Sequence, residues 1–547
     1  MAAQANAAER EPTVTILCNG QVYSPTQEAA TALVMIDDRI AFVGSDQAAR
    51  AAASGAREVD LNGRLVTPAF VDAHLHLIQT GQLLTGMDLH HCRTRDEVLE
   101  TVSSFAASHR DRRLVVGQGW DERKWPDPRP PTRSELDRAA SGMAVYLARV
   151  DVHSAVVSTA LQDQLPGITG AEGYRADGLL SRQAHHLVRG RMDRLFTDAE
   201  RRSDASTAML QAASLGVGAV HELGGPDLGP IEDLTRVREA ADELGIGLVC
   251  YWGELASTDA LAKGRSAGAA GLAGDLCIDG SIGSHTASLF EPYRDQDAAT
   301  PGAKGTRYLS DEEIMGHIID CTRAGVQAGF HCIGDEAVAA AVEGFRRAAS
   351  VLGLVALRRG RHRLEHVEMA AEADFPTLAT YGVIASMQPA FDALWGGRGE
   401  LYGQRLGEPR AAHMNRLGSL HRAGVGLALG TDSPVTPLAA WETVRAAVRH
   451  TRSMERLTVE EAFAAATLGG HRAAAVDDSG LLFPGWRADV AVWELGGTIR
   501  TLSGLPQLDQ DTPLPSCVAT LVAGRQIYGS QDLGLPRHDG VAPSPAG

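Results

Sequence analysis

One stretch of the sequence decides the fold: Val66-Thr67-Pro68-Ala69-Phe70-Val71-Asp72-Ala73-His74-Leu75-His76. After the proline comes a short apolar run that ends in two histidines spaced i, i+2. Residues two apart on a strand point to the same side, so both imidazoles would enter one pocket. Two converging neutral imidazoles supply half of the ligands of a divalent metal ion. The alternative is a pair of surface histidines, but the apolar run favours a buried strand that ends at a cavity.

The composition is ordinary for a globular protein and excludes some partners. The chain has 547 residues, 44% of them hydrophobic and 22% charged, which leaves room for one large domain and a smaller one. A net charge of −17 disfavours nucleic acid and membranes as partners. We expect no secretory signal in residues 1–12 and no membrane span, because no apolar run is long enough. Seven scattered cysteines form no disulfide pattern, which favours the cytoplasm.

The middle of the chain alternates strand-like apolar runs with helical patterns. This alternation is typical of a parallel α/β fold, and eight strands are what a (β/α)8 TIM barrel needs. We therefore predict a metal-dependent TIM barrel, whose active site lies at the C-terminal ends of the strands. The eight expected strands are residues 70–76, 216–223, 247–254, 276–281, 326–334, 362–368, 382–389 and 424–433.

Both ends of the chain carry short alternating apolar segments. We expect them to meet in one β-sandwich accessory domain made of residues 1–68 and 480–533, with the barrel in 69–479. Residues 88–210, after the first barrel strand, are too many for one βα connection. We predict that they form an insertion that caps the barrel mouth and shapes substrate access. The tail, 534–547, is rich in proline, glycine and alanine and is predicted to be disordered.

Further candidate ligands follow other expected strands. His331 ends the fifth, His366 the sixth and Asp432 the eighth, while Asp279 closes the fourth. With the opening pair, four histidines and one aspartate would converge at one face of the barrel. This set of nitrogen and oxygen donors suits Zn²⁺, Mn²⁺, Fe²⁺ or Co²⁺.

The chain resembles the amidohydrolase superfamily of metal-dependent hydrolases, and most of all the amidohydrolase 3 branch with its YtcJ-like proteins and N-substituted formamide deformylases. The motifs that carry the resemblance follow one another over residues 60–495: TPAFVDAHLHL, GVGAVHE, DGSIGSHTASLFEPY, HCIGDEA, RLEHVE, SMQP, GTDSPV and FPGWRADVAVW. The resemblance implies a metal-binding (β/α)8 barrel and a small β-sandwich made from both chain ends, in agreement with the sequence pattern.

The resemblance also implies roles for the ligands. His74 and His76 would bind the more buried metal, His331 and His366 the second, and Asp432 would contact metal and hydroxide. A metal makes hydroxide available at neutral pH and polarises the scissile carbonyl. Asp432 would accept the proton on attack and return it to the leaving nitrogen. Zinc is the expected ion, with manganese, iron and cobalt as alternatives, and one or two ions would be bound.

The chain departs from many relatives at the metal bridge. Binuclear members often use a carboxylated lysine on the fourth strand, four residues before the Asp-Gly pair. Asp275 stands there in this chain, and none of its three lysines lies on an expected barrel strand, so no carboxylated lysine is expected. Either Glu222 or Asp279 bridges, with Glu222 the first choice, or the site works with one metal.

Other residues are candidates for the pocket. Glu365 directly precedes a ligand, so we expect it to point away from the site and to tie neighbouring strands. For Trp120 and Asp121 a role as scaffold of the insertion is the alternative to substrate contact. The residues predicted to bind substrate are Trp120, Asp121, His153, Asp279 and His285.

The leading functional hypothesis is hydrolysis of a non-peptide carbon–nitrogen bond in a small molecule: an amide, an N-substituted formamide or a cyclic amide. A heterocycle deaminase on the same barrel is the second hypothesis. A non-catalytic scaffold protein is the third, and the presence of all five ligands speaks against it. The resemblance allows a homodimer and leaves the oligomeric state open.

Overall fold

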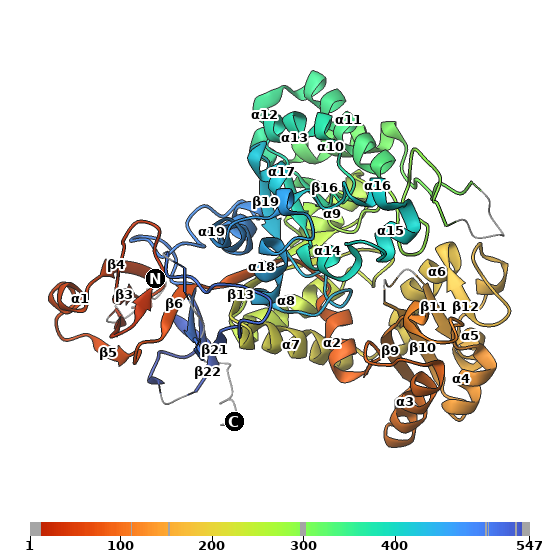
Figure 1. Ribbon diagram of the computed structural model, residues 1–547, viewed down its shortest axis with the longest axis horizontal. Helices are drawn as coiled ribbons and strands as arrows, with labels where there is room; N and C mark the ends of the chain where they lie inside the picture. Colours follow the sequence, from red (N-terminus) through yellow and green to blue (C-terminus); the bar gives the residue numbers. More distant parts are fainter. Residues whose placement is uncertain are drawn as a thin grey trace, which may run out of the picture.

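The computed structural model describes residues 12–110, 112–150, 152, 154–295, 302–497, 500–501, 503–530 and 533–538. Figure 1 shows a central barrel, two small sheets at one side where the chain ends meet, and a separate α/β unit at the other. Among the described residues, no helix is both long and apolar enough to cross a membrane.

The centre of the molecule is a sheet of eight parallel strands that is nearly closed into a barrel. Neighbouring strands pair in chain order, and a parallel bridge between Leu75 and Ser433 links the first strand to the residues after the last. This confirms the predicted (β/α)8 fold. The strands are β7 (Phe70–Leu75), β13 (Val217–Gly224), β14 (Gly247–Trp252), β15 (Gly271–Leu272), β16 (Gln327–Cys332), β17 (Arg363–His366), β18 (Ile384–Met387) and β19 (Gly426–Leu429).

The fourth barrel strand differs from the prediction. β15 covers only Gly271 and Leu272, whereas the expected strand, 276–281, is irregular apart from a bridge between Cys277 and His331. Gly274 explains the early end, because its φ of 82° lies in the left-handed region and takes the chain out of the extended conformation of a strand. The prediction of strand four was wrong, and Asp275 therefore follows the strand where it was expected to precede it.

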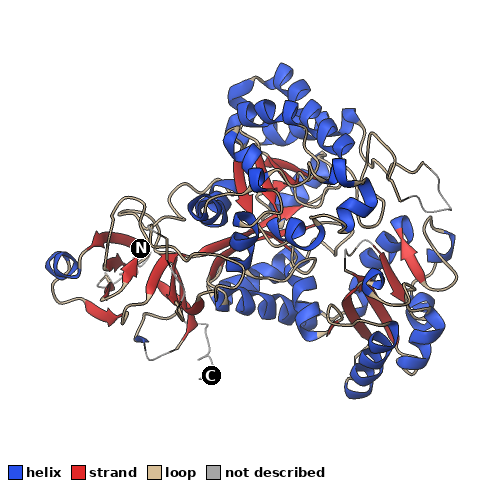
Figure 2. Cartoon of the chain, in the orientation of Figure 1, coloured by secondary structure: helices blue, strands red, loops and turns tan. Residues whose placement is uncertain are grey.

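Helices surround the barrel strands (Figure 2). Their ends follow local sequence signals: capping boxes of Thr197 with Glu200 and Ser310 with Glu313 begin two of them, and Gly325 ends one in the left-handed conformation. The helices are α2 (Leu77–Thr85), α7 (Asp198–Ser214), α8 (Asp233–Leu244), α9 (Thr258–Ser266), α10 (Asp311–Ala324), α11 (Asp335–Leu352), α12 (Leu354–Gly360), α13 (Phe375–Tyr381), α14 (Pro389–Trp395), α15 (Leu401–Leu406), α16 (Glu408–Ala411), α17 (Leu417–Arg422), α18 (Ala440–Val448), α19 (Val459–Ala464) and α20 (Gly470–Ala473).

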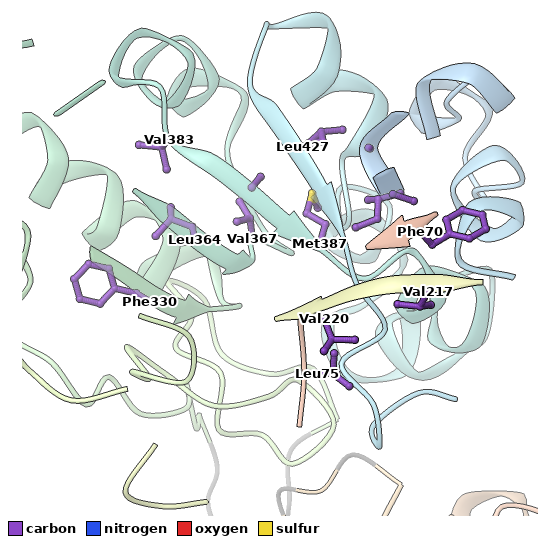
Figure 3. Packing of buried hydrophobic residues seen from close by; sticks show 14 of the residues in the cluster. Phe70, Leu75, Val217, Val220, Phe330, Leu364, Val367, Val383, Met387 and Leu427 are labelled. Carbon is purple, nitrogen blue, oxygen red and sulfur yellow. The ribbon is translucent and has the colours of Figure 1, made fainter. Parts of the chain in front are cut away.

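Apolar side chains fill the space between the barrel strands and these helices. Figure 3 shows Phe70, Val220, Phe330 and Leu364 among them, each at most 1% exposed. All six residues of β7 are buried, as expected for a parallel strand that is covered on both faces. The run that leads to the histidine pair is therefore a core strand.

The two chain ends share a pair of small sheets. One has the order β4-β3-β1-β5 and the other β2-β6-β20-β21-β22. Val66 of the N-terminal part pairs with Val492 of the C-terminal part in antiparallel fashion, so the ends meet as expected. The elements are β1 (Val14–Cys18), β2 (Gln21–Val22), β3 (Ala32–Ile36), β4 (Arg39–Gly44), α1 (Asp46–Ala52), β5 (Arg57–Asp60), β6 (Leu65–Pro68), β20 (Val490–Glu494), β21 (Ser516–Val522) and β22 (Arg525–Gly529).

The long segment after β7 forms its own α/β unit, with a sheet in the order β12-β11-β10-β9-β8. Its elements are β8 (Met87–Asp88), α3 (Arg95–Ser108), β9 (Leu114–Trp120), α4 (Arg133–Ala139), β10 (Ala144–Arg149), β11 (Ser154–Val157), α5 (Thr159–Gln164), β12 (Leu179–Ser181) and α6 (Arg182–Met192). We call this unit the insertion.

The start of the expected tail is ordered. Leu535 is buried among residues of the small sheets, and Arg537 forms a parallel bridge with Gln526. Residues 539–547 lie outside the described residues.

Candidate functional site

The histidine pair lies at the C-terminal end of β7, facing two carboxylates. His76 Nε2 is 3.2 Å from Asp432 Oδ1 and 3.4 Å from Asp275 Oδ2. His74 Nε2 is 3.4 Å from Asp432 Oδ1 and 3.7 Å from Asp275 Oδ1. Both rings are buried, so their i, i+2 spacing directs them into one pocket.

The other two predicted histidines meet this pair. The ring centroid of His366 lies 4.5 Å from that of His331 and 4.9 Å from that of His74. His366 ends β17 with a φ of 70°, so the strand leaves its extended path at this residue. Side chains from strands β7, β16 and β17 thus gather at one end of the barrel.

These residues fit a divalent metal ion. The ligand atoms of His74, His76 and Asp432 all lie within 4.8 Å of one another, and those of His74, Asp275 and His366 do the same. Asp275 Oδ1 and His366 Nε2 are buried without a hydrogen-bond partner. Because buried polar atoms are nearly always paired, unpaired ligand atoms that face one another indicate a place for a cation. Imidazole nitrogens and carboxylates together suit a transition-metal ion.

The Nδ1 atoms of three of the four histidines contact acceptors outside the candidate metal site. His74 Nδ1 lies 2.8 Å from Glu365 Oε2, His76 Nδ1 lies 3.0 Å from the carbonyl oxygen of Leu223, and His366 Nδ1 lies 2.7 Å from Gln388 Oε1. Such contacts fix the orientation of each ring and leave its Nε2 for a metal.

Glu365 points into the barrel, which corrects the expectation that it faces away from the site. Besides His74, it receives hydrogen bonds from Arg363, with Nε to Oε1 at 2.5 Å and Nη2 to Oε2 at 2.9 Å. Burial favours the neutral carboxyl, but the charges of Arg363 and His74 hold the pKa of Glu365 below its ordinary value. In a regular strand, Glu365 and His366 would point to opposite faces. They do not here, because the backbone at His366 leaves the extended conformation.

Asp432 is buried close to the histidine pair, with a backbone N–H that donates to the carbonyl oxygen of His74 at 2.7 Å. Burial favours its neutral form, yet the facing histidines His74 and His76 hold the pKa of Asp432 well below its ordinary value. The carboxylate is therefore ionised at neutral pH and can accept a proton.

Besides Asp432, the carboxylate that groups with the histidines as a possible ligand is that of Asp275. Asp279 Oδ1 lies 3.9 Å from His331 Nδ1 but belongs to no such group. Glu222 Oε2 accepts a hydrogen bond from the backbone N–H of Leu77 at 2.7 Å. Asp279 accepts from three backbone N–H groups, those of Ser288 and Gly334 at 2.8 Å and that of Ile333 at 3.0 Å. Burial raises the pKa of each carboxyl to about 7. Neither joins a ligand group, so both support the backbone around the site.

Sequence reasoning missed Asp275 as a candidate ligand. Its signal was available, because Asp275 stands four residues before the Asp279-Gly280 pair, where the family resemblance places a metal bridge. The misplaced fourth strand hid this signal, since Asp275 was assigned to the wrong end of a barrel strand. In the structure it follows β15 by three residues and so reaches the C-terminal face.

Four of the residues predicted to bind substrate, Trp120, Asp121, Asp279 and His285, do not line the cavity described below. Trp120 is fully buried, and its Nε1 donates to the carbonyl oxygen of Leu147 at 3.0 Å. Asp121 pairs with Arg123 at 2.6 Å. His285 Nε2 is 3.1 Å from Asp295 Oδ1. His153 lies outside the described residues.

A cavity of about 860 Å³ opens from the metal ligands toward the insertion. This volume is typical of a site for a small molecule. The barrel contributes His76, Asp275, His331, His366 and Asp432, and the insertion contributes Val116, Gln118, Tyr146, Arg182, His186, Arg189 and Met192. The candidate metal site therefore forms one wall of a substrate-sized cavity.

Comparisons with known proteins agree with this geometry. A family model described as "Amidohydrolase family" matches residues 57–528. Protein LONG AFTER FAR-RED 3 of Arabidopsis thaliana is 26% identical over 94% of this chain and 91% of its own length. N-substituted formamide deformylase of Arthrobacter pascens is 24% identical over 87% of this chain and 92% of its own length. The crystal structure of an uncharacterized metal-dependent hydrolase from Pyrococcus furiosus superposes with a TM-score of 0.69 at 26% identity, covering 88% of this chain and 98% of the other.

Proposed function

Because this chain belongs to the amidohydrolase family of metal-dependent hydrolases, we propose that it cleaves a carbon–nitrogen bond outside peptides. The substrate class is an amide, an N-substituted formamide or a cyclic amide. The observation that carries the proposal is the convergence of four histidines and two aspartates on the wall of a cavity large enough for such a molecule. Similarity to an N-substituted formamide deformylase adds support.

The donor atoms suggest how metal would be held. His74, His76 and Asp432 would bind one ion, and His331 and His366 would bind a second. Asp275 would be a further ligand, because its oxygens approach His74 and His76 and one of them lies within 4.8 Å of ligand atoms of His74 and His366. A divalent ion, with zinc as the first expectation, supplies Lewis acidity that makes water more acidic and polarises a carbonyl oxygen.

Asp432 would carry the proton. Its ionised carboxylate accepts a proton from the water whose oxygen attacks the carbonyl carbon. When the carbon–nitrogen bond breaks, Asp432 returns that proton to the leaving nitrogen. The products are a carboxylic acid and an amine, and the carboxylate is regenerated for the next turnover.

The surroundings keep this machinery in place. Glu365 and Gln388 hold the imidazole rings. The backbone hydrogen bonds to Asp279 join the residues that follow β16, Ile333 and Gly334, to Ser288. The seven cysteines are free, which supports our proposal that the protein works in the reducing cytoplasm.

The experiment combines metal analysis with a hydrolysis screen. Purified protein is loaded with Zn²⁺ or Mn²⁺, its metal content is measured, and it is incubated with N-formyl, N-acyl and cyclic amides and with a purine and pyrimidine panel. Amine release from amides supports the proposal, whereas ammonia from heterocycles alone would favour a deaminase. Metal-loaded protein that hydrolyses neither class would favour a scaffold.

A further inference from the structure

Arg189 is a charged side chain of the cavity wall that forms no ion pair among the described residues. It lies on α6 of the insertion, is partly buried and lines the cavity that also contains the metal ligands. Within the described part of the chain it forms no side-chain hydrogen bond and no ion pair. A guanidinium partly withdrawn from water without an anion is unfavourable, so a ligand that brings an anion would be stabilised there.

The other charged groups of the cavity, outside the metal ligands, are paired. Arg182 Nη1 lies 2.6 Å from Glu172 Oε1. His186 Nδ1 lies 3.3 Å from Asp227 Oδ2. Two further charged groups of the cavity are paired with residues that do not line it. Arg201 bonds to Asp233, and Glu254 Oε2 accepts a hydrogen bond from Lys263 Nζ at 2.7 Å. Among the described residues that line the cavity, Arg189 is therefore the cation available to a ligand.

The charge of Arg189 reaches into the cavity. Burial raises the pKa of Tyr146 to about 12, and Arg189 opposes this rise from across the wall. The neighbouring imidazole of His186 lowers the pKa of Asp227, and Arg189 adds to that lowering. Both Tyr146 and Asp227 line the cavity, so the positive charge of the Arg189 guanidinium is felt by groups inside it.

We propose that Arg189 binds a carboxylate of the substrate within the cavity that also contains the metal ligands. The inference rests on the proposed function and narrows its substrate class to amides that carry a carboxylate beyond the scissile bond. Guanidinium and carboxylate are planar and can form two parallel hydrogen bonds.

The rest of the wall limits the ligand further. One arginine balances one negative charge, and the acids Asp227, Asp275 and Asp432 on the same wall disfavour a dianion such as a phosphate monoester. Apolar residues, among them Leu83, Val116, Met192, Phe196 and Leu255, also line the cavity. The expected substrate therefore has an apolar body, with an amide at one end and a single carboxylate at the other.

The test compares substrates that differ only in the charge at the far end. N-formyl-ω-amino acids with chains of increasing length are set against the alcohols in which CH₂OH replaces the carboxylate, all with zinc-loaded protein. We expect kcat/KM to favour the acid by about 10- to 100-fold at the best chain length, as for a hydrogen bond to a charged group. In Arg189→Gln the KM of the acids should rise until the preference is lost, while the kinetics of the alcohols stay unchanged. Arg189→Lys should retain part of the preference.

Arg191→Gln is the matched control, because Arg191 lies on the same helix, bonds to the carbonyl oxygen of Pro166 and does not line the cavity. It should keep the preference for acids. Equal kcat/KM for acid and alcohol in the parent protein, or a preference that survives in Arg189→Gln, would overturn the proposal.

A binding arm separates this proposal from the proposed function. The ketones 6-oxoheptanoate and 7-hydroxyheptan-2-one cannot be hydrolysed, and their Kd values are measured by calorimetry with the zinc-loaded protein. Tighter binding of the acid that is lost in Arg189→Gln supports the carboxylate site even if no amide is cleaved. Equal binding of both ketones contradicts it whatever the hydrolysis screen shows.

Discussion

Glu365 controls His74 from the side of the ring that faces away from the metal pocket. It is fully buried, and so is Arg363, whose guanidinium also donates to the carbonyl oxygen of Ala73 at 2.7 Å. The pair thus ties β17 to β7 while it orients an imidazole. Buried ion pairs of this kind are costly to break, because removal of one partner leaves an uncompensated charge.

We predict that Glu365→Gln weakens both the fold and the metal site. The unpaired Arg363 should lower the free energy of unfolding by about 3–5 kcal/mol, and metal affinity should fall about 10- to 100-fold as His74 loses its charged acceptor. Thermal unfolding and metal titration measure the two effects. Glu372→Gln, which removes the exposed partner of Arg416, is the control and should change neither.

Asp432→Asn should remove proton transfer and keep the fold. The amide has nearly the same shape but cannot accept the proton, so kcat should fall by about 10²- to 10⁴-fold. Steady-state kinetics and circular dichroism on the metal-loaded variant check this. Full activity in Asp432→Asn would exclude Asp432 as the proton carrier.

At the scale of elements, helices α2 and α7 are joined by a buried acid. Thr85 Oγ1 of α2 donates to Asp204 Oδ1 of α7 at 3.2 Å, and burial raises the pKa of Asp204 from 3.8 to about 6. An acid with a raised pKa costs stability when it is ionised. The cost is absent below pH 3.8, grows as the pH rises and is complete above about pH 6.

Asp204→Asn should therefore stabilise the protein at high pH. The amide oxygen can still accept from Thr85 without a charge, so the gain should approach, as an upper bound, about 3 kcal/mol at pH 8 and vanish near pH 4. Thermal unfolding of parent and variant across this pH range measures the difference. A constant difference at all pH values would show that ionisation of Asp204 is not its cause.

The elements also show what the sequence could predict and what it could not. His74, His76 and Asp432 were identified because each ends an apolar strand, and strand ends define the active face of a barrel. Asp275 was missed because β15 is only two residues long and the apolar run after it, residues 276–281, has the sequence pattern of a strand. Arg189 has no motif at all, and its significance depends on which neighbouring charges are paired, a property of the folded chain.

At the scale of the whole molecule, Trp493 joins the small sheets to the barrel. Its ring lies edge-on to Phe70 of β7 at 5.7 Å and to Trp441 of α18 at 5.4 Å, and its Nε1 donates to Thr67 Oγ1 at 2.8 Å. Gly216 completes the contact, because a Cβ at that position would lie 2.1 Å from the indole. The small sheets and the barrel therefore share one packed core.

This shared core predicts joint unfolding. The parent protein should show one calorimetric transition for the barrel and the small sheets, and Trp493→Ala should lower the stability by about 3–5 kcal/mol through loss of packing. Trp486→Ala is the control, since Trp486 lies outside that core and its ring contacts Phe483 instead. A Trp493→Ala variant with an unchanged Tm would show that the two parts do not depend on each other.

The carboxylate of Asp275 is part of the polypeptide as it is synthesised, and this has a consequence for how the protein matures. A carboxylated lysine must first capture carbon dioxide, so its metal site assembles only where that gas is present. Asp275 needs no such step. Metal-free protein in buffer purged of carbon dioxide and bicarbonate should therefore take up zinc as fast and as completely as in air, which time-resolved metal analysis can measure. Dependence of uptake on added bicarbonate would show that another, gas-derived ligand completes the site.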